Sequence, residues 1–435
     1  MRIIGSLLCL LLFLSCSFSP TNAQTQPQNE ADFPCSVAWN LDTNYTEISV
    51  MMKIQGNSLY FVSGSQKSGI PIKLWKVNLD NGVKTWETIE VSGYLQSIQV
   101  CDPYVFLFID KGSNVLCFDN KTGALLATIQ FDADVDNATD KTVWLGSVVA
   151  DGNTMVWGAG SGLYTFDITR INFSKPASEV QIIPPVLIYD VPQYTGIACT
   201  PVIEDHIVYF MRCAYMDELG ENTIAAYNLE TNTLLWERKS NKMTGLVIDG
   251  MLIDGEWLYI VDAWGSTCIN KKTGGKNASS STGERWVRNG DDELGPILSA
   301  HAYGYGSVIY DGKLYFTNSA SWSTWSYLNW PKEKVKNIIC MDCEDGTLVW
   351  GDMPPGKCGS LGARPVLANG KAYIAHYDGL RVYDAASGRL YGVDRNITSS
   401  GIYSRNLYYQ EKNLVIVNSL NDDGITSRIV AIRAE

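Results

Sequence analysis

Short apolar runs that flank Asp-Gly or Asn-Gly recur along the whole chain. The stretches 149–157 and 308–316 carry Asp-Gly near their centres, and the stretch 366–373 carries Asn-Gly. These dipeptides adopt positive φ angles at low cost, so the apolar residues on both sides pair as a tight β-hairpin. The pattern predicts hairpins whose second strands centre on these residues: Tyr60, Phe106, Val156, Tyr209, Tyr259, Tyr315, Tyr373 and Val415.

A second motif follows most of these hairpins. It reads small residue, any residue, Asp or Asn, three residues, Gly and, in some copies, Trp four positions later; the clearest copy spans 340–350. The Asp can cap a turn, the Gly supplies a positive φ, and the Trp of the next strand can wedge between neighbouring sheets. The residues that we assign to the motif are Trp39, Trp86, Trp236, Trp350, Asp119, Asp342, Asp384, Gly123, Gly346 and Gly388.

Two hairpins in succession give one four-stranded antiparallel sheet per repeat, and the repeats recur roughly every 40 to 60 residues, as propeller blades do. The C-terminal repeat offers only three strands, and a lone strand at 36–41, which contains Trp39, can complete it. The alternative is an open array of seven blades, but closure hides sheet edges. We therefore predict an all-β fold, a single eight-bladed β-propeller over 36–435 closed by the N-terminal strand.

The first residues resemble a targeting segment. Arg2 precedes an apolar stretch at 3–14, and small residues at 21–23 offer a cleavage site. This pattern predicts a signal peptide at 1–23, a short extension at 24–35, and a secreted, extracellular or periplasmic protein. The alternative is a lipoprotein anchored at Cys16, for which the residues before Cys16 are a poor match.

Export affects what we expect of the cysteines and asparagines. An oxidising compartment favours disulfides, and the candidate pairs are Cys199 with Cys213 and Cys343 with Cys358. Six N-x-S/T sequons are compatible with a secreted glycoprotein: Asn44, Asn120, Asn137, Asn172, Asn277 and Asn396.

The charge of the chain narrows the class of partner. The formal net charge is −12, and an acidic surface repels phosphate backbones, so we expect no nucleic-acid partner. Beyond the apolar stretch near the start, no run is long enough to cross a bilayer, and we expect a monomer without a transmembrane segment.

The motif resembles the tryptophan-docking repeat of PQQ-like (quinoprotein alcohol dehydrogenase-like) propellers. The resemblance covers almost the whole chain after residue 23 and implies the propeller fold. The family includes alcohol dehydrogenases that use PQQ and calcium, and also non-catalytic outer-membrane assembly lipoproteins. Its catalytic members have a disulfide between adjacent cysteines, and this sequence has no Cys-Cys pair; Cys340-x-x-Cys343 is followed by Glu344, not by the His of a haem site. The resemblance therefore assigns no catalytic or PQQ-binding residue here.

Metal sites have weak support. Asp132, Asp134 and Asp136 begin like a calcium loop, but the twelfth position is Val143, so the bidentate Glu is missing and a solvated acidic loop is favoured. The three His residues are far apart in sequence, and Cys340 occupies the small buried position of the repeat, so we expect no zinc site.

Two segments of the sixth repeat are rich in aromatic residues. One is an insertion at 319–336 and the other is the preceding link at 288–306, and both connections belong to the same propeller face. Exposed aromatic side chains bind sugar rings, flat cofactors or proteins; alternatively, these rings pack on one another to hold a long loop. The candidate ligand-binding residues are Trp322, Trp325, Tyr327, Trp330, His301, Tyr303 and Tyr305.

Two functions remain from the sequence. The first is a non-catalytic module that binds a protein or carbohydrate on this loop face. The alternative is a PQQ-dependent oxidoreductase that acts on alcohols or sugars and holds PQQ and calcium. The missing pair of adjacent cysteines favours the first.

Overall fold

The chain divides into two compact units, residues 1–30 and residues 31–435, and the strands lie in the second. The computed structural model describes residues 30–43, 45, 52–64, 71–93, 95–109, 114–131, 148–159, 162–191, 195–197, 199–214, 222–240, 251–261, 265–275, 283–289, 306–317, 336, 338–354, 364–398, 406–421 and 426–435. Among these residues, no helix is long and apolar enough to cross a membrane.

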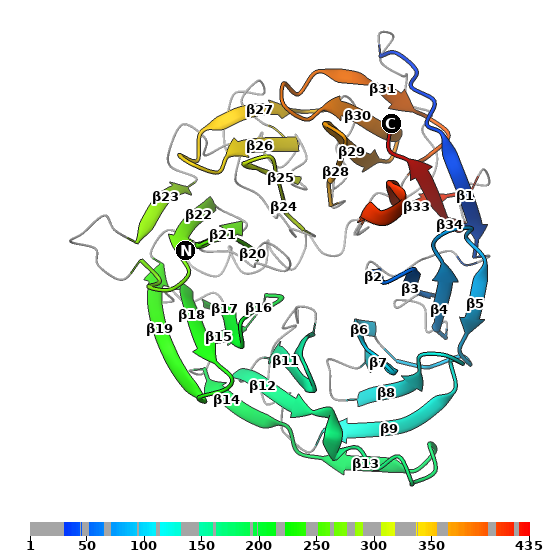
Figure 1. Ribbon diagram of the computed structural model, residues 1–435, viewed down its shortest axis with the longest axis vertical. Coiled ribbons are helices and arrows are strands. Elements are labelled where there is room, and N and C mark those ends of the chain that lie inside the picture. Colours follow the sequence, from blue (N-terminus) through cyan, green and yellow to red (C-terminus); the bar gives the residue numbers. More distant parts are fainter. Residues whose placement is uncertain are drawn as a thin grey trace, which may run out of the picture. The chain divides into compact units, whose positions relative to one another are not determined.

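Residues 31–435 form eight β-sheets, which we call blades 1 to 8, and Figure 1 shows them arranged around a circle. The innermost strand of each blade, which is the first strand except in blade 4, where it is β16, contacts the innermost strands of both neighbouring blades, and this series closes on itself. The structure therefore confirms the predicted eight-bladed propeller of antiparallel four-stranded blades.

Blade 1 consists of β2 (Lys53–Gln55), β3 (Ser58–Ser63), β4 (Lys73–Asn78) and β5 (Lys84–Glu87), and blade 2 contains β6 (Leu95–Cys101), β7 (Tyr104–Ile109), β8 (Asn114–Asp119) and β9 (Leu125–Phe131). Blade 3 consists of β10 (Val149–Asp151), β11 (Thr154–Ala159), β12 (Gly162–Asp167) and β14 (Val186–Asp190). Blade 4 consists of β15 (Thr195–Ile197), β16 (Val202–Glu204), β17 (Ile207–Ala214), β18 (Asn222–Asn228) and β19 (Thr233–Ser240).

Blade 5 consists of β20 (Met251–Asp254), β21 (Trp257–Val261), β22 (Gly265–Asn270) and β23 (Glu284–Asn289), and blade 6 of β24 (Val308–Tyr310), β25 (Lys313–Thr317), β26 (Ile338–Asp342) and β27 (Leu348–Asp352). Blade 7 consists of β28 (Val366–Ala368), β29 (Lys371–His376), β30 (Gly379–Asp384) and β31 (Leu390–Asp394). Blade 8 consists of β32 (Leu407–Tyr409), β33 (Leu414–Leu420), β34 (Ser427–Arg433) and β1 (Val37–Asp42). Two short 3-10 helices are η2 (Ile168–Arg170) and η4 (Gln410–Lys412).

The N-terminal strand closes the ring, as predicted. β1 pairs antiparallel with β34, so the last blade combines both ends of residues 31–435. The indole N–H of Trp39 donates to the carbonyl of Leu79 in blade 1 at 2.8 Å. Because β1 covers the edge of β34, blade 8 does not end in an unpaired third strand.

Two blades have a fifth strand. In blade 4, β15 and β16 both pair with β17, whereas the fifth strand of blade 2 comes from a later part of the chain. The chain leaves blade 3 after β12, forms η2, and then adds β13 (Val180–Ile183) to the outer edge of blade 2 before it returns as β14. β13 runs parallel to β9, with Val180 beside Thr128. Blade 2 therefore has five strands, and β13 forms its outer edge.

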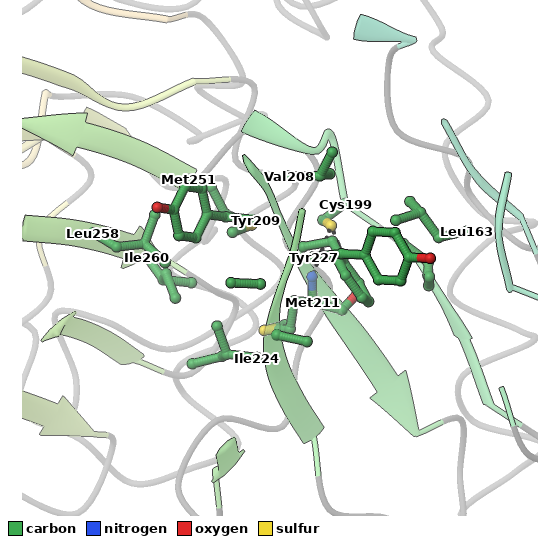
Figure 2. Packing of buried hydrophobic residues seen from close by; sticks show 14 of the residues in the cluster. Leu163, Cys199, Val208, Tyr209, Met211, Ile224, Tyr227, Met251, Leu258 and Ile260 are labelled. Carbon is green, nitrogen blue, oxygen red and sulfur yellow. Dashed lines mark hydrogen bonds between the residues drawn. The ribbon is translucent and has the colours of Figure 1, made fainter. Parts of the chain in front are cut away.

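Apolar side chains fill the layers between blades. Figure 2 shows one such cluster, in which Leu163 of blade 3, Tyr209 of blade 4 and Leu258 of blade 5 belong to one continuous set of buried residues. Each sheet is apolar on both faces because both faces pack against a neighbouring blade, which explains the nearly unbroken apolar runs of the second strands.

Candidate functional site

The predicted ligand-binding residues all lie outside the described residues. They are His301, Tyr303, Tyr305, Trp322, Trp325, Tyr327 and Trp330. The calcium candidates Asp132, Asp134 and Asp136 also lie outside the described residues. The structure does fix the strands at which the aromatic insertion starts and ends. β25 ends at Thr317 and β26 begins at Ile338, and these two residues pair directly across the sheet.

A network of buried polar side chains lies at this end of blades 6 and 7. Asp352, the last residue of β27, pairs in register with Ile338. The Tyr383 hydroxyl donates to Oδ2 of Asp352 at 2.9 Å and so joins the two blades. The turn at 377–378 joins the second and third strands of blade 7 and therefore lies on the same face as the insertion at 318–337.

Asp378 in this turn connects two buried ionisable side chains of the network. Its Oδ2 accepts from Nη2 of Arg381 at 2.6 Å, and its Oδ1 is paired with Nδ1 of His376. Arg381 is 0% and His376 is 1% exposed. A guanidinium this deeply buried requires a carboxylate partner, because an unpaired charge in the interior is costly.

The network shifts the ionisation of its members in opposite directions. Burial alone would raise the pKa of Asp378, but the hydrogen bond with His376 and the electrostatic interactions with His376 and Arg381 outweigh it and lower that pKa. Burial, followed by the negative charge of Asp352, raises the pKa of Tyr383 well above its usual value. At neutral pH the site therefore holds an ionised Asp378 and a neutral Tyr383.

The described contacts of the network are structural ones. Nε2 of His376 is buried and has no hydrogen-bond partner among the described residues, and the imidazole packs on the Tyr377 ring with centroids 4.1 Å apart. No hydroxyl or thiol nucleophile bonds to this His in the described contacts. What the arrangement does is fix the ends of β26, β27, β29 and β30, from which the connections of this face extend.

We tested whether the described residues suit the cofactors of the PQQ dehydrogenases. They contain no group of three or more His, Cys, Asp or Glu placed to hold a metal ion. Cys340 is a buried thiol in β26, Cys343 is a buried thiol in the turn that follows this strand, and the two are not adjacent in sequence. No step through PQQ or calcium therefore follows from these residues.

The structure brings a Trp of the repeat motif against a Gly of the next copy of the motif, with one such Trp–Gly pair at each of several junctions between neighbouring blades. Trp350 donates its indole N–H to the carbonyl of Ala385 at 2.8 Å, and a Cβ on Gly388 would lie 2.4 Å from its ring. The same arrangement joins these pairs: Trp39 with Gly82, Trp86 with Gly123, Trp236 with Gly274 and Trp286 with Gly346.

The motif Asp residues cap the turns as predicted. Oδ1 of Asp119, Asp342 and Asp384 accepts from a backbone N–H two or three residues later at 2.7–3.0 Å. Hydrogen bonds from the side chain and backbone of Thr122 lower the pKa of Asp119, and those from Ser387 lower that of Asp384.

Sequence analysis missed Trp286. Residues 276–282 separate it from the Gly274 turn, so it does not stand four positions after the glycine. The signal that could have found it is its register, because Trp286 pairs with Cys268 as Trp350 pairs with Cys340.

The structure supports neither candidate disulfide. Cys343 is a free, buried thiol, and burial raises its pKa to about 11, so the proposed bond to Cys358 is not formed here. The Cys343 carbonyl instead accepts from the Trp286 indole at 3.0 Å, which holds this turn within the docking motif. The other candidate bond, Cys199 with Cys213, is not formed either: Cys199 is a buried thiol whose Sγ accepts from the backbone N–H of Met211 at 3.1 Å. Cys358 and the side chain of Cys213 lie outside the described residues.

Comparison with solved structures shows what this chain is similar to. It matches a europium-containing methanol dehydrogenase with a TM-score of 0.63 at 12% identity, over 93% of this chain and 95% of that one. It matches the quinohemoprotein alcohol dehydrogenase of Comamonas testosteroni with 0.60 at 11%, over 91% and 76%, and the computationally designed Ika8 protein with 0.54 at 12%, over 91% and 100%. No protein-family model and no curated protein matches the sequence. These similarities confirm the PQQ-type propeller fold, and at such identities they show the fold alone.

Proposed function

We propose that this propeller is a secreted, non-catalytic binding module that holds a carbohydrate or protein ligand on the loop face of blades 5 to 7. The observation that carries the proposal is the buried Asp352–Tyr383–Arg381–Asp378–His376 network at the base of that face. It supports the strands that bear the aromatic insertion at 318–337. Loops held by rigid ends lose less conformational freedom on binding, and so bind more tightly for the same contacts.

Titration of the intrinsic Trp fluorescence across a panel of neutral oligosaccharides, followed by a glycan array, tests the ligand-binding proposal. We expect the double variant Trp322→Ala/Trp325→Ala to lose at least tenfold in affinity for any ligand found. The matched control is Trp257→Ala, because Trp257 begins β21 beside the 255–256 turn on the opposite face. Equal binding by the double variant and the parent would remove the aromatic insertion as the site.

The PQQ-dependent alternative has its own test. Melting temperatures are measured with PQQ and Ca²⁺ together, with each alone, and with neither. A ligand that binds only the folded state raises the melting temperature with concentration, so a module that does not use PQQ should show no concentration-dependent shift. A large shift that needs both PQQ and Ca²⁺ would overturn the binding-module proposal.

Export is part of the proposal and is tested separately. We expect the exported protein to begin near Gln24, which N-terminal sequencing detects. Among the described sequons, Asn172 and Asn396 are exposed, whereas the Asn120 side chain is buried, accepts from Tyr60 at 2.7 Å and donates to Asp102 at 2.8 Å. In a glycosylating host we therefore expect glycans at Asn172 and Asn396 and none at Asn120, as measured by peptide mass spectrometry after glycosidase treatment.

A further inference from the structure

The outer edge of blade 2 differs from the outer edges of the other blades. β1, β5, β14, β19, β23, β27 and β31 each contain at least one charged residue, whereas β13 reads Val-Gln-Ile-Ile. Charged side chains on an edge strand are the usual protection against pairing with another chain. β13 lacks this protection and ends the sheet order of its blade, so within the described residues no strand pairs with its outer side.

The side chains of β13 alternate in a way that leaves an apolar surface exposed. Gln181 and Ile183 are buried, whereas Val180 is 48% and Ile182 is 66% exposed. Residues i and i+2 of a strand lie on one face of the sheet, so the two exposed residues are neighbours there. Burial of both would remove apolar surface from water, which favours a partner on this face.

The charges around β13 indicate what that partner is. Glu179 directly precedes the strand, and its Oε1 accepts from Nζ of Lys175 at 2.5 Å, which leaves Oε2 for a second cation. The Arg170 guanidinium is anchored at the other end, where Nη1 donates to the carbonyl of Pro184 at 2.7 Å. In an antiparallel pair of two identical strands, the start of each strand lies beside the end of the other. A second copy would therefore place its Arg170 beside Glu179 of the first, twice across the two-fold axis.

We propose that β13 pairs antiparallel with β13 of a second copy of this chain and so forms a symmetric dimer. Such an interface is self-complementary, since the same residues serve on both sides. We propose the register centred on Gln181, which places Val180 opposite Ile182 of the second copy. A shift by one residue would bring the exposed pair against the face that Gln181 and Ile183 occupy. The dimer revises the monomer expected from the sequence and does not depend on the proposed function.

Analytical ultracentrifugation over a wide concentration range tests the dimer. We expect the parent to dimerise reversibly and Ile182→Lys to raise the dissociation constant at least tenfold, because the substitution removes exposed apolar surface and places a charged group opposite Val180 of the second copy, twice across the two-fold axis. Val180→Lys should act similarly, whereas the matched control Val349→Lys should not, because Val349 is 39% exposed on the outer strand β27 of another blade. A parent that stays monomeric, or a dimer that survives Ile182→Lys, overturns the proposal.

Charge exchange tests the antiparallel arrangement. Glu179→Arg and Arg170→Glu should each weaken the dimer several-fold, because each places like charges together twice. The double variant Glu179→Arg/Arg170→Glu should recover most of the parent's affinity. A double variant as weak as the worse single variant would show that the two side chains do not meet, and would overturn this arrangement. Melting temperatures of all variants verify that each is folded.

Discussion

Gly388 shows at the scale of one residue how neighbouring blades are held together. Its φ is +70°, and an added Cβ would lie 2.4 Å from the Trp350 ring. Gly370 has a similar φ of +73° and open space around it. We expect Gly370→Ala to cost about 1 kcal/mol of unfolding free energy from the backbone alone, and Gly388→Ala to cost about 1–3 kcal/mol more from overpacking. Urea denaturation measures both; equal losses would mean that the indole moves aside freely.

Asp378 should make stability depend on pH in a defined direction. Its pKa is lowered in the folded state, so the carboxylate stabilises the fold above the unfolded pKa, and this contribution is lost as the pH falls through the folded value. We expect Asp378→Asn to cost about 3 kcal/mol at pH 7, because Arg381 then remains buried without an opposite charge there. The difference from the parent should shrink below about pH 4. Denaturation midpoints from pH 7 to pH 3 measure it, and a constant difference would exclude this role.

At the scale of the element, the parts that sequence predicted are local. A hairpin with an Asp-Gly turn, and likewise the docking motif, depends on only a few consecutive residues. Eight second strands, and four of the five docked tryptophans among the described residues, could therefore be located from the sequence. β13 could not be, because it pairs in parallel with a strand about fifty residues earlier and no turn signal joins the two. The Arg381–Asp378–His376 network was not predicted for a related reason. To recognise it, one must know which face of the strands of blade 7 packs against blade 6.

The two added edge segments lie on blades that lack the docking Trp; blade 3, whose outer strand β14 reads Val-Leu-Ile-Tyr-Asp, also lacks it but has no added strand in the described residues. Ala127 of blade 2 and Gly392 of blade 7 stand where the motif Trp stands in other blades, opposite Cys117 and Val382. At both blades another segment covers the outer edge: β13 lies along β9, and residues 31–33 bond to Val393 in both directions at 3.0 Å. The extra segments therefore lie where the indole contact is missing.

The closing strand β1 gives a prediction for a whole element. A chain that begins at residue 44 lacks β1, so it exposes the edge of β34 and loses the Trp39 contact with blade 1. We expect it to lose at least about 3 kcal/mol of stability, the lower end of the cost of removing a buried Trp.

A synthetic peptide of residues 36–43 added to the shortened chain should restore part of the melting temperature. The same peptide with Trp39→Ala should restore much less, because it can pair with β34 but cannot dock on Gly82. If both peptides act equally, strand pairing alone closes the ring; if neither acts, β1 does not bind independently.

At the scale of the whole molecule, closure predicts that distant blades unfold together. Cys117 of blade 2, Cys268 of blade 5 and Cys340 of blade 6 are fully buried, and burial raises the pKa of each thiol, to about 12 for Cys268 and Cys340. The thiolate is the reactive form, so in the folded ring these groups should not react with a thiol reagent near pH 8. Each should be labelled only when its blade opens.

Labelling rates in low urea, resolved by peptide mass spectrometry, should therefore give the same opening free energy for all three thiols. A closed ring has no terminal blade that could unfold by itself, unlike an open repeat array.

The same thiols predict that stability falls above about pH 8.5, because the thiols of the unfolded chain ionise there while those of the folded chain remain protonated. The labelling experiment can contradict cooperative opening. Opening energies that differ between Cys117 and Cys340 by more than about 2 kcal/mol would show that blades open independently despite the closing strand.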